Sequence, residues 1–185
     1  MASLKPYIFK LAPQLGMSPA ALYERQRALV RAGLLEQGTG RGPGSGVQAN
    51  ASTVALLLIA ALATDNLSDA NVRTREIATT KQQGDLSRLM KGKTFHEAVT
   101  TILGGYALPW LVTKLRIFQS ARQAEIHLGQ MVVLFGAPAP QKLQRLPGVR
   151  VMAEIDGEIL RQISADLAAL RDDDATSRSA KERQD

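Results

Sequence analysis

Residues 7–47 constrain the fold of this chain more than any other part of its 185 residues. The segment reads YIFKLAPQLGMSPAALYERQRALVRAGLLEQGTGRGPGSGV and contains two helix-like patterns, a short turn between them and a glycine-rich loop. Four apolar residues of the first pattern recur at the spacing of one helix face, namely Tyr7, Ile8, Leu11 and Leu15. We therefore expect a first helix over residues 4–15, with this face packed against a core.

A second helix start follows directly. Ser18 and Pro19 place a hydroxyl cap before a proline at the first helical position, where proline's missing N–H costs no hydrogen bond. Gly16 permits a left-handed turn before this start, and Gly33 is suited to the cap after residue 32. The spacing therefore predicts a helix, a tight turn and a second helix over residues 19–32.

The second helix has an apolar side and a polar side. Leu22 and Leu29 lie seven residues apart, so they share one face and are expected to pack inward. Tyr23, Arg27 and Arg31 follow one another at intervals of four and share a different face, which we expect to point outward. A plain helical hairpin with a solvated basic face is the simplest alternative interpretation of the same pattern.

The glycine-rich loop contains five glycines within residues 38–46. We expect Leu34–Glu36 and Val47–Ala49 to pair as short strands on either side of it, which would make the loop a wing. A phosphate-binding loop needs either G-x-x-x-x-G-K-[ST] or a G-x-G-x-x-G that opens a helix, and residues 38–46 contain neither spacing. Nucleotide binding of these two types is therefore excluded for the loop.

Charge and residue types narrow the class of function. The net charge is +6, and residues 1–50 hold six basic and two acidic residues, a net of +4, which suits a polyanionic partner at this end. No cysteine is present to supply thiol chemistry. The two histidines, His96 and His127, lie in a predicted capping box and a predicted strand, so we expect ordinary roles for them. We therefore expect no enzyme activity, no cofactor and no metal site.

The remainder predicts a second, mixed unit. Residues 51–63 form an apolar run that is too short for the roughly 20 residues of a membrane span, so we expect a buried helix and no membrane association. The chain also lacks a signal-peptide pattern. We therefore expect a cytoplasmic, nucleoid-associated protein. Strand-like segments KLRIF, AEIHL, MVVLF and GVRVMAEI precede an amphipathic helix from residue 156. We expect an α+β protein with a winged helix-turn-helix domain over 1–66, a helical and antiparallel-β domain for dimerisation, effector binding or protein interaction over 67–171, and a disordered tail over 172–185.

The first third of the chain resembles a known class of domain. LAPQLGMSPAALYE is similar to the helix-turn-helix of MerR-type regulators, and Gly33–Leu35, Arg41 and Gly46-Val47 resemble the wing of that family. The long second helix that leads into Gly33–Leu35 also resembles MarR-type regulators. Residues 4–65 therefore look like a winged helix-turn-helix domain of bacterial transcriptional regulators, although the second helix is about a turn longer than in MerR-type proteins and only two helices precede the wing.

The resemblance implies which residues meet DNA. Helix-turn-helix proteins place the second helix in the major groove, which here implies a set of groove-facing residues: Ser18, Ala20, Ala21, Tyr23, Glu24 and Arg27. Arg31 would lie nearer the phosphates. The wing would contact the backbone or the minor groove through Thr39, Arg41 and Ser45.

The sequence thus predicts a sequence-specific, double-stranded DNA-binding transcriptional regulator. Because one such module covers little DNA, we expect a homodimer or a partner protein bound through the C-terminal domain. Two alternatives stay open. The chain could be an architectural, replication or recombination accessory of a phage or mobile element, or its winged helix could serve as a protein-interaction module.

Overall fold

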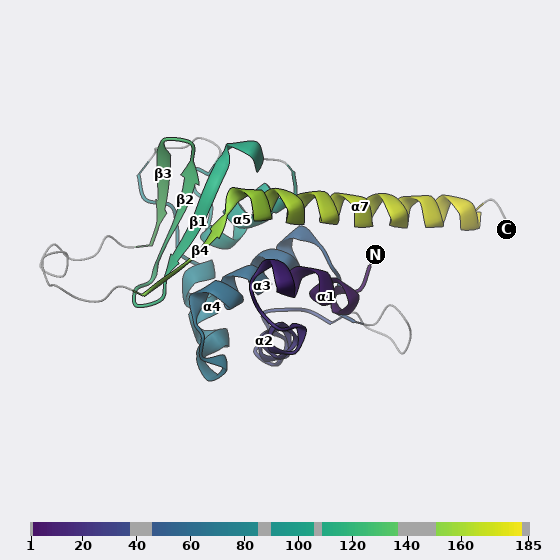
Figure 1. Cartoon of the computed structure of the whole chain (residues 1–185), viewed down its shortest axis with the longest axis horizontal. Helices are drawn as coiled ribbons and strands as arrows, with labels where there is room; N and C mark the ends of the chain where they lie inside the picture. Colours follow the sequence, from purple (N-terminus) through teal and green to yellow (C-terminus); the bar gives the residue numbers. More distant parts are fainter. Residues whose placement is uncertain (1, 38–45, 85–89, 106–108, 137–150, 183–185) are drawn as a thin grey trace, which may run out of the picture.

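The helices of the chain precede and follow a small antiparallel sheet, as the sequence predicted for an α+β protein. The computed structural model describes residues 2–37, 46–84, 90–105, 109–136 and 151–182. The helices are α1 (Leu4–Gln14), α2 (Pro19–Arg31), α3 (Ala51–Ala63), α4 (Ala70–Ala78), α5 (Phe95–Leu103) and α7 (Gly157–Glu182), with short 3-10 turns η1 (Leu67–Asp69) and η2 (Pro109–Leu111). The strands are β1 (Val112–Phe118), β2 (Gln123–Leu128), β3 (Met131–Phe135) and β4 (Met152–Asp156), in the spatial order β3-β2-β1-β4 (Figure 1).

Local signals at the N-terminal end of the chain are confirmed. Gly16 adopts the left-handed conformation with φ of 65°, and Gly33 does so with φ of 67°. The Ser18 hydroxyl oxygen accepts a hydrogen bond from the Ala21 backbone N–H at 3.2 Å, which caps α2. α1 and α2 therefore form two helices joined by a tight turn, with Leu22 and Leu29 fully buried.

Helix α3 is the centre of the core. The Asn50 side chain caps its start by accepting a hydrogen bond from the Thr53 N–H at 2.9 Å, and its body is apolar on almost every side, as the sequence indicated. The helix packs against α2 on one side and against α4 and α5 on another (Figure 1). One continuous cluster of buried side chains consequently runs from α1 through α3 to the sheet, across the predicted domain boundary at residue 66.

One face of the sheet is buried and the other is charged. Ile117, Ile126 and Phe135 point into the core, and Phe135 meets Phe95 of α5 edge-on, with ring centroids 5.2 Å apart. On the opposite face, Arg116 Nε donates to Glu154 Oε2 across β1 and β4 at 2.9 Å. The alternation fixes the strand register, because a slip by one residue would bury this charged face.

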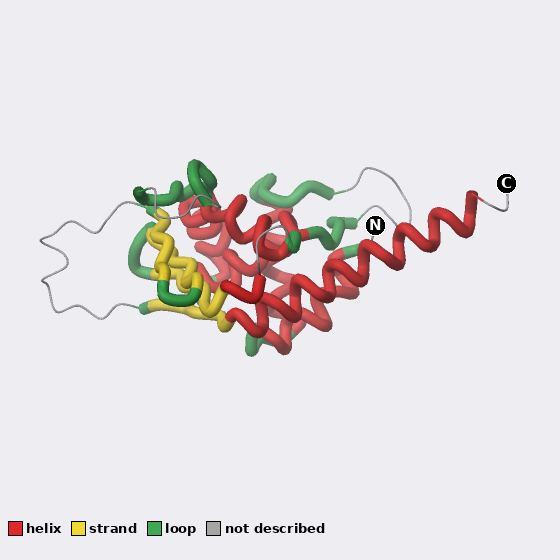
Figure 2. Tube along the Cα trace, turned by 90° about the horizontal axis from the view of Figure 1, so that it is seen from above, coloured by secondary structure: helices red, strands yellow, loops and turns green. Residues whose placement is uncertain are grey.

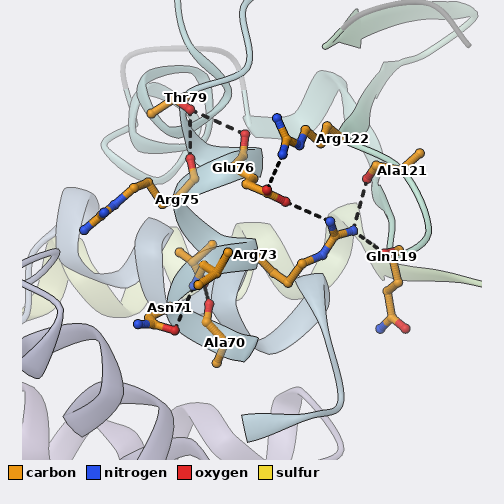
Figure 3. A network of polar contacts seen from close by, with 11 residues as sticks. Ala70, Asn71, Arg73, Arg75, Glu76, Thr79, Gln119, Ala121 and Arg122 are labelled. Carbon is orange, nitrogen blue, oxygen red and sulfur yellow. Dashed lines mark hydrogen bonds and ion pairs between the residues drawn. The ribbon is translucent and has the colours of Figure 1, made fainter. Parts of the chain in front are cut away.

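The β1–β2 turn is fastened to α4 by charge (Figure 3). Glu76 accepts from Arg73 Nη1 at 2.8 Å and from Arg122 Nη2 at 2.5 Å. Arg73 also donates to the backbone carbonyl oxygens of Gln119 and Ala121 within the turn. The hairpin is therefore held against the helical half of the molecule and does not depend on apolar contacts alone.

Two sequence predictions differ from the structure. Val47–Ala49 does not pair with Leu34–Glu36. It pairs with the N-terminal residues, with Leu4 N–H donating to the Val47 carbonyl at 2.7 Å and Ala49 N–H donating to the Ala2 carbonyl at 2.9 Å. The Leu34 N–H instead bonds to the Leu29 carbonyl at 2.9 Å and finishes α2. The expected pairing was wrong because the end of α2 already uses this backbone.

The second difference concerns the C-terminal tail. Composition predicted disorder over residues 172–185, whereas helix α7 continues to Glu182. Beyond the part that packs on α5 and β1, the helix projects from the body of the molecule (Figure 2). The helix continues here from a packed first half, so its propagation needs no new nucleus.

Candidate nucleic-acid interface

Helix α2 presents a line of exposed side chains along one side. The α2 stripe, as we name it, consists of Ala20, Glu24, Arg27 and Arg31, which follow at helical spacings of four, three and four. Arg27 Nη1 lies 2.9 Å from Glu24 Oε1, and the two side chains are 56% and 40% exposed. Because an exposed pair of this kind is worth little, the Arg27 guanidinium stays available to an anion. The small Ala20 side chain leaves the first turn of α2 open to close approach.

Tyr23 lies at the edge of this surface and not on the α2 stripe. Its ring is partly buried against the core and faces α1, where Lys5 Nζ lies 5.8 Å from the ring centroid. The sequence placed Tyr23 with Arg27 and Arg31, but a repeat of four drifts around a helix that has 3.6 residues in each turn. The drift brings Tyr23 to the side where α1 packs.

The remaining predicted contact residues divide into two groups. Ser18 and Ala21 of the first turn contribute to the helix cap, and Ala21 is partly buried. Thr39, Arg41 and Ser45, the predicted wing residues, lie outside the described residues. The structure therefore brings Ala20, Glu24, Arg27 and Arg31 together on one surface and places Tyr23 beside it.

Arg25 supports this unit from within, and the sequence analysis did not single it out. Its side chain is buried on the inner side of α2, where Nη2 donates to the backbone carbonyl oxygens of Thr64 at 3.1 Å and Asp65 at 3.3 Å. Burial lowers the pKa of Arg25, and the Asp65 carboxylate opposes that change. The signal was present, because Arg25 lies between Leu22 and Leu29 on the helix face that those leucines define.

An ion pair joins helix α7 to helix α1. The Asp166 side chain is only 6% exposed, and its Oδ1 accepts from Lys10 Nζ of α1 at 2.7 Å and from Gln162 Nε2 at 2.9 Å. Burial raises the pKa of the nearby Tyr7, and the Asp166 carboxylate adds to the rise. The C-terminal helix therefore supports α1 through an ion pair, although nothing in the local sequence links the two segments.

A histidine and a serine meet beside α3, and their geometry bears on catalysis. His96 Nε2 lies 3.2 Å from Ser52 Oγ and 3.0 Å from the Ser52 carbonyl oxygen. Because a carbonyl oxygen only accepts, this second contact requires the proton on Nε2. The same nitrogen then has no lone pair with which to take the serine proton, so the arrangement does not make a nucleophile and base pair.

The other residue types that carry chemistry form no further site in the described part of the chain. Within it, histidine, aspartate and glutamate side chains form no group of three placed to hold a metal ion. Among the described helices, none combines the length and the apolar character that crossing a membrane requires. The outer side of α2 carries two exposed arginines, Arg27 and Arg31.

Known proteins give no independent assignment for this surface. Comparison with models of protein families gives no match, and neither curated protein sequences nor solved structures match the chain. The candidate interface is therefore argued from the geometry of α1 and α2 alone.

Proposed function

We propose that the chain is a double-stranded DNA-binding protein that regulates transcription, with α2 in the major groove and the glycine-rich loop on the DNA backbone. The observation that carries the proposal is the α2 stripe itself. It lies on a helix that is entered through a tight turn and held from behind by Leu22, Arg25 and Leu29. Helix-turn-helix proteins use a helix supported in this way to reach base edges.

The residue types of the α2 stripe suit this role. Arg27 is placed to donate two hydrogen bonds to guanine or to hold a phosphate, and Arg31, one turn later, is placed to hold the flanking backbone. Glu24 can accept from cytosine once Arg27 has turned to the DNA. Two or three cations make a small footprint, so tight binding requires a homodimer or a partner protein.

The test compares two exposed arginines that each pair with a glutamate. Arg27 belongs to the α2 stripe, whereas Arg122, which is 71% exposed and pairs with Glu76, lies in the β1–β2 turn. In fluorescence anisotropy with duplexes selected from genomic fragments, Arg27→Ala is expected to weaken binding at least about tenfold, in the range for a lost guanine contact. Arg122→Ala is expected to bind as the unmodified protein does, and circular dichroism checks that both variants fold.

Two results would count against this function. If the full chain fails to bind any duplex at low salt, the basic surface serves another partner, as in the protein-interaction alternative. If it binds DNA but its chromosomal sites cluster at a replication origin or a phage attachment site, the accessory role of a phage or mobile element replaces transcription regulation. Chromatin immunoprecipitation with sequencing distinguishes that pattern from promoter peaks.

A further inference from the structure

A small apolar groove lies between α1 and the start of α2, next to the α2 stripe. Its volume is about 200 Å³, and its lining consists of Lys5, Ile8, Phe9, Pro19, Ala20 and Tyr23. Ala20 belongs to the α2 stripe and to this lining at once. Anything that binds along the α2 stripe therefore passes the mouth of the groove, which we call the α1–α2 groove.

One wall of the groove is the aromatic ring of Phe9, which lies outside the hydrophobic core. The Phe9 side chain is 64% exposed, whereas its neighbour Ile8 is 1% exposed and lies at the groove floor. A phenylalanine this exposed contributes little to folding, because most of its ring stays in water. The Tyr23 ring provides a second aromatic surface, and Lys5 lies near it.

Charge around the groove limits what can fill it. Residues 1–23 contain Lys5 and Lys10 and no aspartate or glutamate. Lys10 is engaged with Asp166, whereas Lys5 lines the groove itself and Arg27 follows Tyr23 by one helical turn. An occupant that suits the site has an apolar, flat part for the groove and negative charge on either side of it.

A nucleobase with its flanking phosphates has this combination of properties. Proteins that bind unpaired nucleic acid stack bases on aromatic side chains and hold the backbone with nearby cations. Proteins that distort a duplex insert apolar side chains between its base steps. In both cases a base leaves its own stack and meets an exposed aromatic ring.

We propose that the α1–α2 groove accepts one unstacked base of the DNA that α2 binds, with its ring against Phe9 and its flanking phosphates near Lys5 and Arg27. This inference rests on the proposed function and adds that the bound DNA is opened at one position. The base comes from a duplex that is locally unpaired, because the proposed function places α2 in the major groove of double-stranded DNA. Oligothymidine tests a single strand as the other source.

The experiment uses the full chain and three labelled DNAs in fluorescence anisotropy. They are oligothymidine of about 20 nucleotides, which exceeds the length that one small binding fold covers, a fully paired duplex, and the same duplex with one unpaired base. Phe9→Leu removes the ring and keeps an apolar side chain, whereas Phe9→Trp keeps a ring. Trp110→Leu is the matched control, because Trp110 is 67% exposed and lies in η2, away from α2 in sequence.

Loss of base stacking is expected to weaken binding of Phe9→Leu at least about fivefold, while Phe9→Trp and Trp110→Leu bind as the unmodified protein does. An equal loss on oligothymidine would identify a single strand as the source of the base and would overturn the opened duplex. A loss confined to the duplex with the unpaired base identifies an opened duplex. Oligothymidine or duplex that carries 5-iodouracil at the unpaired position is expected to photo-cross-link to the peptide that contains Phe9.

Different results would refute the base site and the proposed DNA binding by α2. If Phe9→Leu binds every probe as tightly as the unmodified protein and no cross-link reaches the groove, the base site is wrong. Loss of duplex binding in Arg27→Ala would then still support α2 as a DNA-binding helix. If the unmodified chain binds none of the three probes, both proposals are wrong together.

Discussion

Arg25 Nη2 donates a hydrogen bond to the backbone carbonyl oxygen of Thr64, 3.1 Å away, and so joins the inner side of α2 to the end of α3. The last carbonyl groups of a helix lack partners within the helix, and a buried guanidinium supplies one here. The orientation of the α2 stripe therefore depends on a residue that points away from it. The arginines of α2 therefore differ in role: Arg25 stabilises the fold, whereas Arg27 and Arg31 lie on the exposed α2 stripe.

Replacing Arg25 is expected to affect stability, whereas replacing Arg31 is not. Arg25→Ala should lower the free energy of unfolding by about 2–3 kcal/mol, because it removes the hydrogen bonds that a charged, buried donor makes to the Thr64 and Asp65 carbonyls. Arg31 is exposed on the α2 stripe, so Arg31→Ala should change stability by less than about 0.5 kcal/mol. Urea unfolding followed by circular dichroism measures both, and equal losses in the two variants would contradict the assignment.

The salt dependence of DNA binding should report the phosphate contact assigned to Arg31. Each phosphate that a cation neutralises adds about 0.9 to the slope of log affinity against log salt concentration. We expect Arg31→Ala to reduce the magnitude of that slope by about this amount and to weaken binding similarly for different sequences. Anisotropy titrations over a range of salt concentrations check this, with Arg122→Ala as the control. An unchanged slope would place Arg31 away from the phosphates.

Tyr7 should make stability fall at high pH. Its hydroxyl is buried and has no hydrogen-bond partner among the described residues, and burial raises its pKa above the ordinary value of about 10. A raised pKa in the folded state favours the protonated form, so this contribution is fully present below pH of about 10 and is lost as the pH rises through the folded-state pKa. Tyr7→Phe is expected to unfold at higher urea concentration than the unmodified protein above that pH.

The same substitution should be harmless at neutral pH, because it removes an unpaired buried hydroxyl. Tyr23→Phe is the matched control, since the Tyr23 ring lies at the edge of α2 and Tyr7 lies in the core. Parallel pH profiles for Tyr7→Phe and the unmodified protein would show that ionisation of Tyr7 does not contribute.

Gly157 should tolerate no side chain at the start of α7. A Cβ at this position would lie 1.8 Å from the Val112 carbonyl oxygen, so the β1 backbone would have to move. Gly157→Ala is expected to cost about 3 kcal/mol, at the upper end for overpacking. Gly16→Ala meets nothing within 4 Å and suffers only from its φ of +65°, which costs about 1–2 kcal/mol. Thermal unfolding of the two variants should reproduce this order, and a reversed order would show that the backbone near Val112 yields easily.

Short-range chemistry was readable from the sequence. Ser18 and Asn50 cap their helices, and Thr94 and Glu97 form the predicted capping box, in which Thr94 N–H donates to Glu97 Oε2 at 2.7 Å. The strand segments also follow their alternation, and Gly16 forms the predicted turn. These features depend on groups that lie a few residues apart, so the local sequence is sufficient to predict them.

The candidate interface was only partly readable. Arg27 and Arg31 lie on the outer side of α2 as the spacing predicted, because their helix packs by its leucines. Tyr23 lies at the edge of the α2 stripe and not on it, because its ring faces α1 and Lys5. The groove beside Phe9 could not be foreseen, because it exists only where two helices meet at a particular angle.

The sequence by itself therefore determined where the main helices begin, which segments form the sheet, and which side of α2 is polar. Only the tertiary structure decided that Val47–Ala49 pairs with Ala2–Leu4, that Arg25 closes the end of α3 and that Asp166 holds Lys10. The physical reason is the range of the interactions. Caps and turns are satisfied within one or two helical turns, whereas a buried charge or an edge backbone takes its partner from whichever distant segment packs beside it.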